Sequence, residues 1–295
     1  MTRSSETAAK AEIIAAMLIF GTIGIFVRFI PLPSGILALT RAILGSVFLI
    51  CVIAVRRTHV SWSAVRKNLP ALCFSGACIG VNWILLFESY RYTTVSTATL
   101  CYYMAPVFIT LASPVVLRER LTPLKLVCVA AALCGMALIS GISGTEGISY
   151  IGLLLGLGAA VLYACVVLTN KKLRGLGSFD TTVSQLVVAA VVLLPYTLLT
   201  EDLSAVSLEP LPIALLFVVG IVHTGIAYAL YFSSMRSIRA QTAAILSYID
   251  PVTAIILSAL ILNEKMTAAG IAGAVLILAS TLISELCGQK QYNKE

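Results

Sequence analysis

Two stretches of the chain repeat each other: FESYRYTTVSTATLCYYMAPVFITLASPVVLRERLT (87–122) and FSSMRSIRAQTAAILSYIDPVTAIILSALILNEKMT (232–267). They align without a gap, 145 positions apart, and twelve of the thirty-six aligned positions are identical. The identical positions include polar landmarks as well as apolar residues, among them Arg91/Arg236, Tyr103/Tyr248, Pro106/Pro251 and Glu119/Glu264. Such in-register similarity indicates an internal duplication rather than a shared composition.

The composition is that of an integral membrane protein. Of the 295 residues, 59% are hydrophobic and 11% are charged, whereas about a quarter of the residues of a soluble protein are charged. The formal net charge of +7 comes from basic residues in short loops between apolar runs. No basic stripe with interleaved aromatic residues accompanies them, so the charge does not indicate nucleic-acid binding.

Ten apolar runs are candidate transmembrane helices, because about 20 helical residues cross the hydrocarbon layer. The runs cover residues 12–29, 33–55, 68–89, 95–116, 123–141, 149–170, 181–200, 210–232, 240–262 and 267–286. The connections between them are short and contain Pro, Gly and charged residues, and none is long enough for an extramembrane domain. The sequence therefore predicts an all-α protein that lies almost wholly within the bilayer.

The charges of the connecting loops alternate along the chain. Basic residues gather at both termini and near residues 56–67, 118–125, 171–174 and 236–239, whereas the intervening loops contain Arg91, Glu146, Glu201, Asp202, Glu209, Glu264 and Lys265. The positive-inside rule then places both termini in the cytoplasm, with ten spans of a multi-pass protein of the inner (cytoplasmic) membrane between them. The two copies of the repeat face opposite sides, which predicts two inverted five-helix repeats, residues 1–145 and 146–295.

Motifs of enzymes and cofactor sites are missing from the sequence. There is no Walker motif, no HExxH helix and no GxSxG elbow, so neither ATP hydrolysis nor an intramembrane hydrolase is indicated. The eight cysteines form no CxxC pair and no cluster with metal-ligand spacing, and free cysteines pack as small apolar residues. We expect no enzyme activity, no cofactor and no metal.

Together these features resemble the drug/metabolite transporter superfamily and, within it, the EamA-type permeases. The resemblance rests on the stretches Tyr103–Pro106 and Tyr248–Pro251, on Glu119 and Glu264 at the ends of spans four and nine, and on Arg41 in span two. It implies ten helices around a central cavity, lined chiefly by spans 1, 3, 4, 6, 8 and 9. It also implies transport of a small metabolite, from a range that includes amino acids, their derivatives, amines, sugars and nucleotide-linked metabolites.

Asp250 is the sharpest functional candidate. It lies within span nine directly before Pro251, and its counterpart in the first repeat is the apolar Ala105. A carboxylate inside the bilayer is costly unless it faces a cavity or a partner. It could bind a substrate ammonium group or carry a proton. Alternatively, it caps backbone groups that Pro251 leaves without a partner.

His223 lies near the middle of span eight. A histidine there could relay protons or bind substrate, and it would couple with Asp250 if spans eight and nine meet at the cavity. Alternatively, it forms a hydrogen bond to a Ser or Thr of a neighbouring helix. The sequence leaves both roles open.

Aromatic and amide side chains at mid-depth form a predicted binding set. Aromatic faces suit cations and planar apolar groups, and a small-molecule site is mostly apolar with few polar anchors. The same residues could instead pack between helices or anchor at the interface. With Asp250 and His223, the predicted substrate-binding residues are Asn82, Trp83, Tyr102, Tyr103, Tyr163, Tyr228 and Tyr248.

Two prolines at equivalent positions, Pro106 and Pro251, predict breaks in spans four and nine. Paired breaks in corresponding helices are a sequence pointer to a midplane site. Near the outer ends of spans, Arg28, Glu88 and Arg91 are candidates for an external gate, although ordinary snorkelling to the headgroups also explains them. Glu119 and Glu264 are expected to form structural ion pairs, and Arg41 lies deep enough to need a partner.

These observations predict a secondary transporter for a small metabolite such as an amino acid or amine, working by alternating access. Proton-coupled export through Asp250 and uncoupled facilitation are the two alternatives. Protons, the small-molecule substrate and the lipid bilayer are the expected partners, and the protein is a monomer or a homodimer. An intramembrane enzyme is the disfavoured alternative class.

Overall fold

The computed structural model describes residues 3–57, 60–118, 121–140, 149–202, 209–235, 238 and 240–292. Glu119 and the loop arginines Arg236 and Arg239 lie outside these ranges. Within them the chain is helical, without a β-strand. In this described part of the chain, eight helices are long and apolar enough to cross a membrane, and two shorter apolar helices span Pro123–Ile139 and Ile245–Ile261.

The first half of the chain follows the predicted runs closely. Its helices are α1 (Arg3–Arg28), α2 (Ser34–Val55), α3 (Trp62–Lys67), α4 (Leu69–Tyr92), α5 (Val95–Tyr102), α6 (Ala105–Val116) and α7 (Pro123–Ile139). Local chemistry sets several starts: the hydroxyls of Thr94 and Thr122 accept the backbone N–H groups of Thr97 and Lys125, which satisfies donors that a helix leaves free at its N-terminus. The short helix α3 was not predicted.

The second half contains α8 (Tyr150–Asn170), α9 (Ser178–Thr200), α10 (Pro210–Val218), η2 (Val219–Ile226), α11 (Ala227–Ser234), α12 (Ala240–Ser247), α13 (Ile249–Ile261) and α14 (Ala268–Tyr292). The sequence predicted one regular helix over 210–232, but its middle turns form the π-helix η2. A π-helical segment widens the turn and is frequent at functional sites. This one contains His223 and Thr224.

The helices of spans four and nine are broken at equivalent points. One break separates α5 from α6 just before Pro106, and the other separates α12 from α13 at Tyr248, just before Pro251. Proline has no backbone N–H, so it leaves the carbonyl four residues earlier without its helical partner. At the second break that carbonyl belongs to Ser247.

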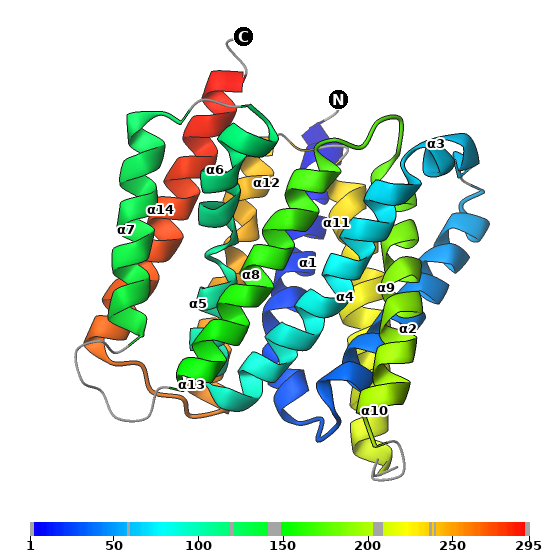
Figure 1. The fold of residues 1–295 in the computed structure, drawn as a ribbon, viewed down its shortest axis with the longest axis horizontal. Coiled ribbons are helices and arrows are strands. Elements are labelled where there is room, and N and C mark those ends of the chain that lie inside the picture. The colour runs from blue at the N-terminus through cyan, green and yellow to red at the C-terminus, as the bar shows by residue number, and fades with distance from the viewer. Residues whose placement is uncertain are drawn as a thin grey trace.

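The helices pack in pairs that join the two halves (Figure 1). α4 lies along α8 and α9, while η2 and α11 lie along α1 and α2; α5 and α6 pack on α8, while α13 packs on α1. Three further contacts are α2 with α9, α5 with α13, and α7 with α14 at one edge of the bundle. α1 begins and α14 ends at the same end of the bundle.

Glycines allow the closest of these contacts. A Cβ at Gly273 would lie 2.5 Å from the Gly135 carbonyl oxygen, and one at Gly135 would lie 2.7 Å from the Gly273 carbonyl oxygen. The backbones of α7 and α14 therefore touch directly, as small residues permit in membrane helix pairs. Between α2 and η2, Gly45 faces Thr224 and Gly220 faces Leu44 in the same way.

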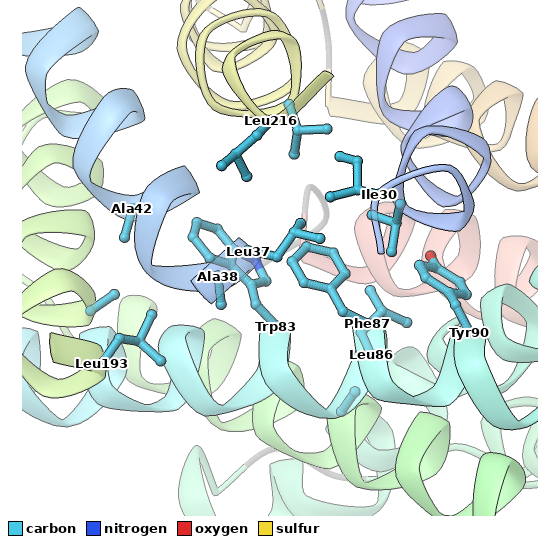
Figure 2. Close-up of a cluster of buried hydrophobic side chains, with 14 of the residues drawn as sticks. Ile30, Leu37, Ala38, Ala42, Trp83, Leu86, Phe87, Tyr90, Leu193 and Leu216 are labelled. Atoms are coloured by element: carbon cyan, nitrogen blue, oxygen red, sulfur yellow. The ribbon is translucent and has the colours of Figure 1, made fainter. Parts of the chain in front are cut away.

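One apolar cluster holds the first helices together (Figure 2). Trp83, Phe87 and Tyr90 point from α4 toward Leu37 of α2 and Ile30, which follows α1. Large apolar side chains also cover the outside of the bundle; Val47, Val115, Val191, Leu199 and Leu260 are examples. An outward apolar surface of this kind fits a protein whose solvent is the bilayer.

Candidate functional site

Tyr103 and Asp250 connect the two helix breaks. The Tyr103 hydroxyl donates to Oδ2 of Asp250 across 2.9 Å and lies 3.5 Å from the carbonyl oxygen of Ser247. That carbonyl is the one that Pro251 leaves without its helical donor. A side chain from the first break thus meets the carboxylate and the free backbone group of the second. The backbone of Asp250 packs on Gly21 of α1, where a Cβ would lie 2.6 Å from the Asp250 carbonyl oxygen.

Three further tyrosines continue the site from this pair. The ring of Tyr103 lies 6.2 Å from that of Tyr248 and 6.4 Å from that of Tyr102, and the rings of Tyr102 and Tyr163 are 5.3 Å apart. α5, the α5–α6 break, the α12–α13 break and α8 contribute these rings. Tyr102, Tyr103, Tyr248 and Asp250 are half-buried, which leaves part of each side chain available to a ligand.

Trp83 and Tyr228 belong to a second group, centred on Arg41. The Arg41 guanidinium lies 4.1 Å from the centre of the Trp83 ring and 5.7 Å from that of Phe87. Its Nε donates to Oγ1 of Thr224 across 2.7 Å, and Tyr228 lies within electrostatic range. Tyr228 also contacts other rings: those of Phe20 at 5.4 Å and Phe232 at 5.9 Å.

The structure gives Asn82 a packing role. Asn82 is buried and its amide Nδ2 donates to the backbone carbonyl of Ala159, which fastens α4 to α8. An interhelical hydrogen bond of this kind stabilises helix packing within a membrane. The amide donor is thereby engaged by protein rather than presented to a solute.

His223 also contacts protein rather than Asp250. Its Nε2 lies 2.8 Å from Oγ1 of Thr22, its Nδ1 lies 3.4 Å from the Val218 carbonyl oxygen, and its ring packs edge-on against Phe26. Only 1% of the residue is exposed. The geometry matches the interhelical hydrogen bond that the sequence left open as one alternative. The described partners of His223 do not include Asp250, the other member of the predicted relay.

The predicted gate residues lie at the end of the bundle opposite the termini, in two separate groups. Arg28 Nη2 lies 3.4 Å from Glu264 Oε1, and its Nη1 donates to the Tyr90 carbonyl. The other carboxylate oxygen of Glu264 accepts the Val95 backbone N–H at 2.9 Å and the Ser258 hydroxyl. Glu264 therefore joins α1, α5 and α13.

Glu88 and Arg91 form the second group. Glu88 accepts the Ser34 hydroxyl at 2.6 Å, and Arg91 Nη1 lies 3.5 Å from the same carboxylate oxygen. This pair joins α4 to the start of α2. The sequence predicted that Glu264 would be a structural ion pair and that Arg28 would belong to the gate with Glu88 and Arg91. Glu264 does form an ion pair, with Arg28 as its partner, while the gate role of Arg28, Glu88 and Arg91 stays a prediction.

Two charged positions were not among the predicted site residues. Arg41 was expected to find a partner for its charge, yet among the described residues it forms no ion pair. Glu285 in α14 was not considered at all, although it lies within electrostatic range of Tyr163, Tyr231 and Tyr248. The signal that the sequence offered for Glu285 was its place as a single acidic residue near the end of a long apolar run. No group of three metal-binding side chains occurs in the described ranges.

A surface pocket lies away from these residues, near the termini. It is formed between α1, α2 and α11 by Glu12, Phe48, Cys51, Val52, Val55, Arg56, Ile226, Ala229, Leu230 and Ser233. None of the predicted substrate-binding residues lines it. The pairing of the two helix breaks, not this pocket, defines the candidate site.

Comparisons with known proteins agree with this architecture. The sequence model of the EamA-like transporter family matches residues 11–141 and 150–286. An uncharacterized transporter of Bacillus subtilis (strain 168), YxxF, is 28% identical over 99% of this chain and 94% of its own. A probable amino-acid metabolite efflux pump of Salmonella typhimurium (strain LT2) is 29% identical over 74% of this chain and 78% of its own.

The fold has also been seen in a crystal structure. A solved protein chain with 20% sequence identity superposes with a TM-score of 0.67, covering 98% of this chain and 99% of the other. At this level of identity the similarity concerns the fold alone.

Proposed function

Because the chain belongs to the EamA-like transporter family, we propose that it is a secondary transporter that moves a small metabolite, such as an amino acid or amine, across the cytoplasmic membrane. The observation that carries this proposal is the contact between Tyr103 and Asp250. It places a carboxylate and a free backbone carbonyl together at facing breaks in two helices. Broken helices that meet within the bilayer are the usual binding element of secondary transporters.

Alternating access between two inverted halves is supported by the helix contacts. When the two halves are exchanged, the contact between α4 and α8 corresponds to the contact between the η2–α11 segment and α1. The contact between α4 and α9 likewise corresponds to the contact between that segment and α2. The pairs α2–α9, α5–α13 and α7–α14 map onto themselves. An arrangement of this kind allows the two halves to exchange conformations around a fixed site. The family model matches the chain in two segments, which supports the same division.

The substrate class follows from the chemistry of the site. Asp250 offers a carboxylate to an ammonium group, and Tyr102, Tyr103 and Tyr163 offer aromatic faces to a cation or an apolar side chain. The name of the Salmonella relative, an amino-acid metabolite efflux pump, supports the same class. Asp250 also provides a group that can exchange protons, so export coupled to protons is the leading mode and uncoupled facilitation is the alternative.

Transport in proteoliposomes tests the proposal. Labelled amino acids, amines and sugars are screened with and without an imposed pH gradient, for the wild type and Asp250→Asn. We expect amino acids or amines to move, a pH gradient to drive their accumulation, and Asp250→Asn to abolish that accumulation. Asp180→Asn, in the first turn of α9, is the matched control and should behave as wild type.

The outcomes separate the two modes and the proposal itself. Flux that ignores the pH gradient and is unchanged in Asp250→Asn assigns uncoupled facilitation. The transporter proposal is overturned if a folded, reconstituted protein moves none of the solutes under any gradient.

A further inference from the structure

Arg41 is a buried cation that the protein leaves incompletely bonded. Only 5% of the residue is exposed, and its Nε donates to Thr224. Among the described residues, no other hydrogen bond and no ion pair engages the guanidinium. In this part of the chain, two side-chain atoms are fully enclosed and have no hydrogen-bond partner, Thr99 Oγ1 and Thr197 Oγ1. The Nη donors of Arg41 are therefore not fully enclosed, and among the described residues they have no acceptor.

The contacts that Arg41 does make do not balance its charge. A guanidinium stays protonated in proteins, and holding it within the bilayer is costly, with a penalty of about 3 kcal/mol or more for a guanidinium at the bilayer centre. Stacking on a desolvated aromatic ring returns about 2 kcal/mol. Trp83 covers one face of the guanidinium and Thr224 takes one donor, so the remaining donors and the charge are available to an anion.

The equivalent position in the second half shows that the scaffold does not require a cation here. Gln185 of α9 aligns with Arg41 when the repeats are shifted by one residue. Its Nε2 donates to Ser75 Oγ at 2.7 Å and to Asn170 Oδ1 at 2.6 Å. Gln185 is thus neutral and hydrogen-bonded within the protein, whereas Arg41 is charged and, among the described residues, its Nη groups have no acceptor.

Arg41 and Asp250 belong to one continuous set of side chains. Tyr102 packs against the apolar cluster that contains Trp83 and Phe87, the two rings that lie over the Arg41 guanidinium. Tyr103, next to Tyr102 in the chain, bonds Asp250 directly. Tyr102 thus lies between the rings that cover the positive group and the tyrosine that bonds the negative one.

Resting on the transport function proposed above, we propose that the Nη groups of Arg41 bind the carboxylate of the transported solute. A planar carboxylate accepts two parallel N–H groups from a guanidinium, which fixes both its position and its orientation. The ammonium group of the same solute then points to Asp250. The substrate is accordingly an amino acid, or a derivative that keeps its free carboxylate, and not a simple amine.

The test compares solutes that differ only at the carboxylate. Phenylalanine, phenylalaninamide and phenethylamine, and likewise leucine and leucinamide, are measured for uptake into proteoliposomes and for thermal stabilisation of the purified protein. Charged hydrogen bonds are worth about 1.5–3 kcal/mol, so we expect the wild type to prefer the amino acids by about 10- to 100-fold. Arg41→Gln should remove this preference, and Arg41→Lys should restore part of it.

A second variant keeps the inference falsifiable if Arg41→Gln does not fold. Thr224→Val removes the acceptor that holds Nε but leaves the charge, so the carboxylate preference should fall by a smaller factor. A purely structural role of Arg41 would lower the uptake of acids, amides and amines together, without changing their ratio.

Two results would overturn the inference. One is equal uptake of amino acids, amides and amines by the wild type, which leaves the transport function standing. The other is stabilisation by chloride or inorganic phosphate alone that equals that by amino acids and disappears in Arg41→Gln, which assigns a resident inorganic anion. Absence of all transport, with amino acids still binding through Arg41, contradicts the transport function instead.

Discussion

Arg28 and Glu264 form an ion pair at the end of the bundle opposite the termini. Their side chains approach to 3.4 Å, and Glu264 is only 9% exposed. The same carboxylate accepts the backbone N–H of Val95, the first residue of α5. Because an acid at a helix N-terminus satisfies free donors and offsets the helix dipole, the pair connects α1 and α13 to the broken helix that carries Tyr103.

Glu264→Gln is expected to loosen this end. It removes the charge that attracts Arg28 and weakens the cap on α5, so we expect a loss of about 1–3 kcal/mol in the stability of the contacts among α1, α5 and α13. Ser96 is the position at which this loosening can be measured, because it is buried and forms a hydrogen bond of 2.9 Å with Ser258, which itself bonds Glu264. Labelling of Ser96→Cys by a membrane-impermeant thiol reagent, measured against the parent without that cysteine, should be faster in Glu264→Gln.

Glu88→Gln is the matched control for Glu264. Glu88 lies near the same end but bonds Ser34 and Arg91, not α5 or α13, so its loss should leave labelling at position 96 near the parent rate. Equal acceleration by both variants would contradict a specific role for Arg28 and Glu264 in the contacts among α1, α5 and α13.

Tyr103→Phe tests the contact between the two helix breaks. The change removes the hydroxyl that donates to Asp250 but keeps the ring contacts with Tyr102 and Tyr248. A hydrogen bond to a charged group contributes about 1.5–3 kcal/mol, so we expect uptake to fall about tenfold or more. Tyr196→Phe on the exposed side of α9 removes the same group and should retain wild-type uptake, which would distinguish a local effect from a general one.

The transmembrane helices could be predicted from the length of each apolar run alone, without any periodic pattern of buried and exposed residues. Each long apolar run is limited by the thickness of the bilayer and ends in Pro, Gly or charged residues, so the expected runs match the helices to within a few residues over most of the chain. The broken helices were also signalled, since Pro106 and Pro251 remove backbone donors at equivalent points. The π-helical turn at His223 left no such trace in the sequence; in the structure its Gly220 and Gly225 lie directly against Leu44 and Phe48 of α2.

The site was only partly predictable, because the sequence shows how deep a polar residue lies in the bilayer but not which residues it contacts. Asp250 and four tyrosines were identified and are brought together, whereas Asn82 and His223 turned out to bond neighbouring helices. The sequence shows that Arg41 is a deep charge, but only the structure shows that Trp83 and Thr224 contact it and that no acid of the described ranges pairs with it. Which of two plausible roles a polar residue takes is decided by the helix that faces it.

His223 is expected to support stability rather than proton coupling. His223→Asn loses the bond to Thr22 and the edge contact with Phe26, which should lower the free energy of unfolding by about 1–3 kcal/mol. The dependence of uptake on an imposed pH gradient should remain. Thr22→Val removes the same hydrogen bond from the other side and should reproduce the loss of stability. If accumulation driven by the pH gradient disappears in His223→Asn while protein stability is preserved, the histidine is part of the coupling pathway.

The contact between α7 and α14 should be sensitive to a single methyl group. A Cβ at Gly273 would lie 2.5 Å from the Gly135 carbonyl oxygen and 2.8 Å from Ile139, so Gly273→Ala must push the two backbones apart. Overpacking of this kind costs about 1–3 kcal/mol, which should appear as a lower melting temperature in detergent. Gly270→Ala, one turn earlier in α14, meets only flexible side-chain atoms at 3.3 Å or more. Because alanine is favoured over glycine in a helix by about 1 kcal/mol, that variant should be neutral or stabilising. Equal melting temperatures for the two variants would mean that the backbones of α7 and α14 do not touch at Gly135.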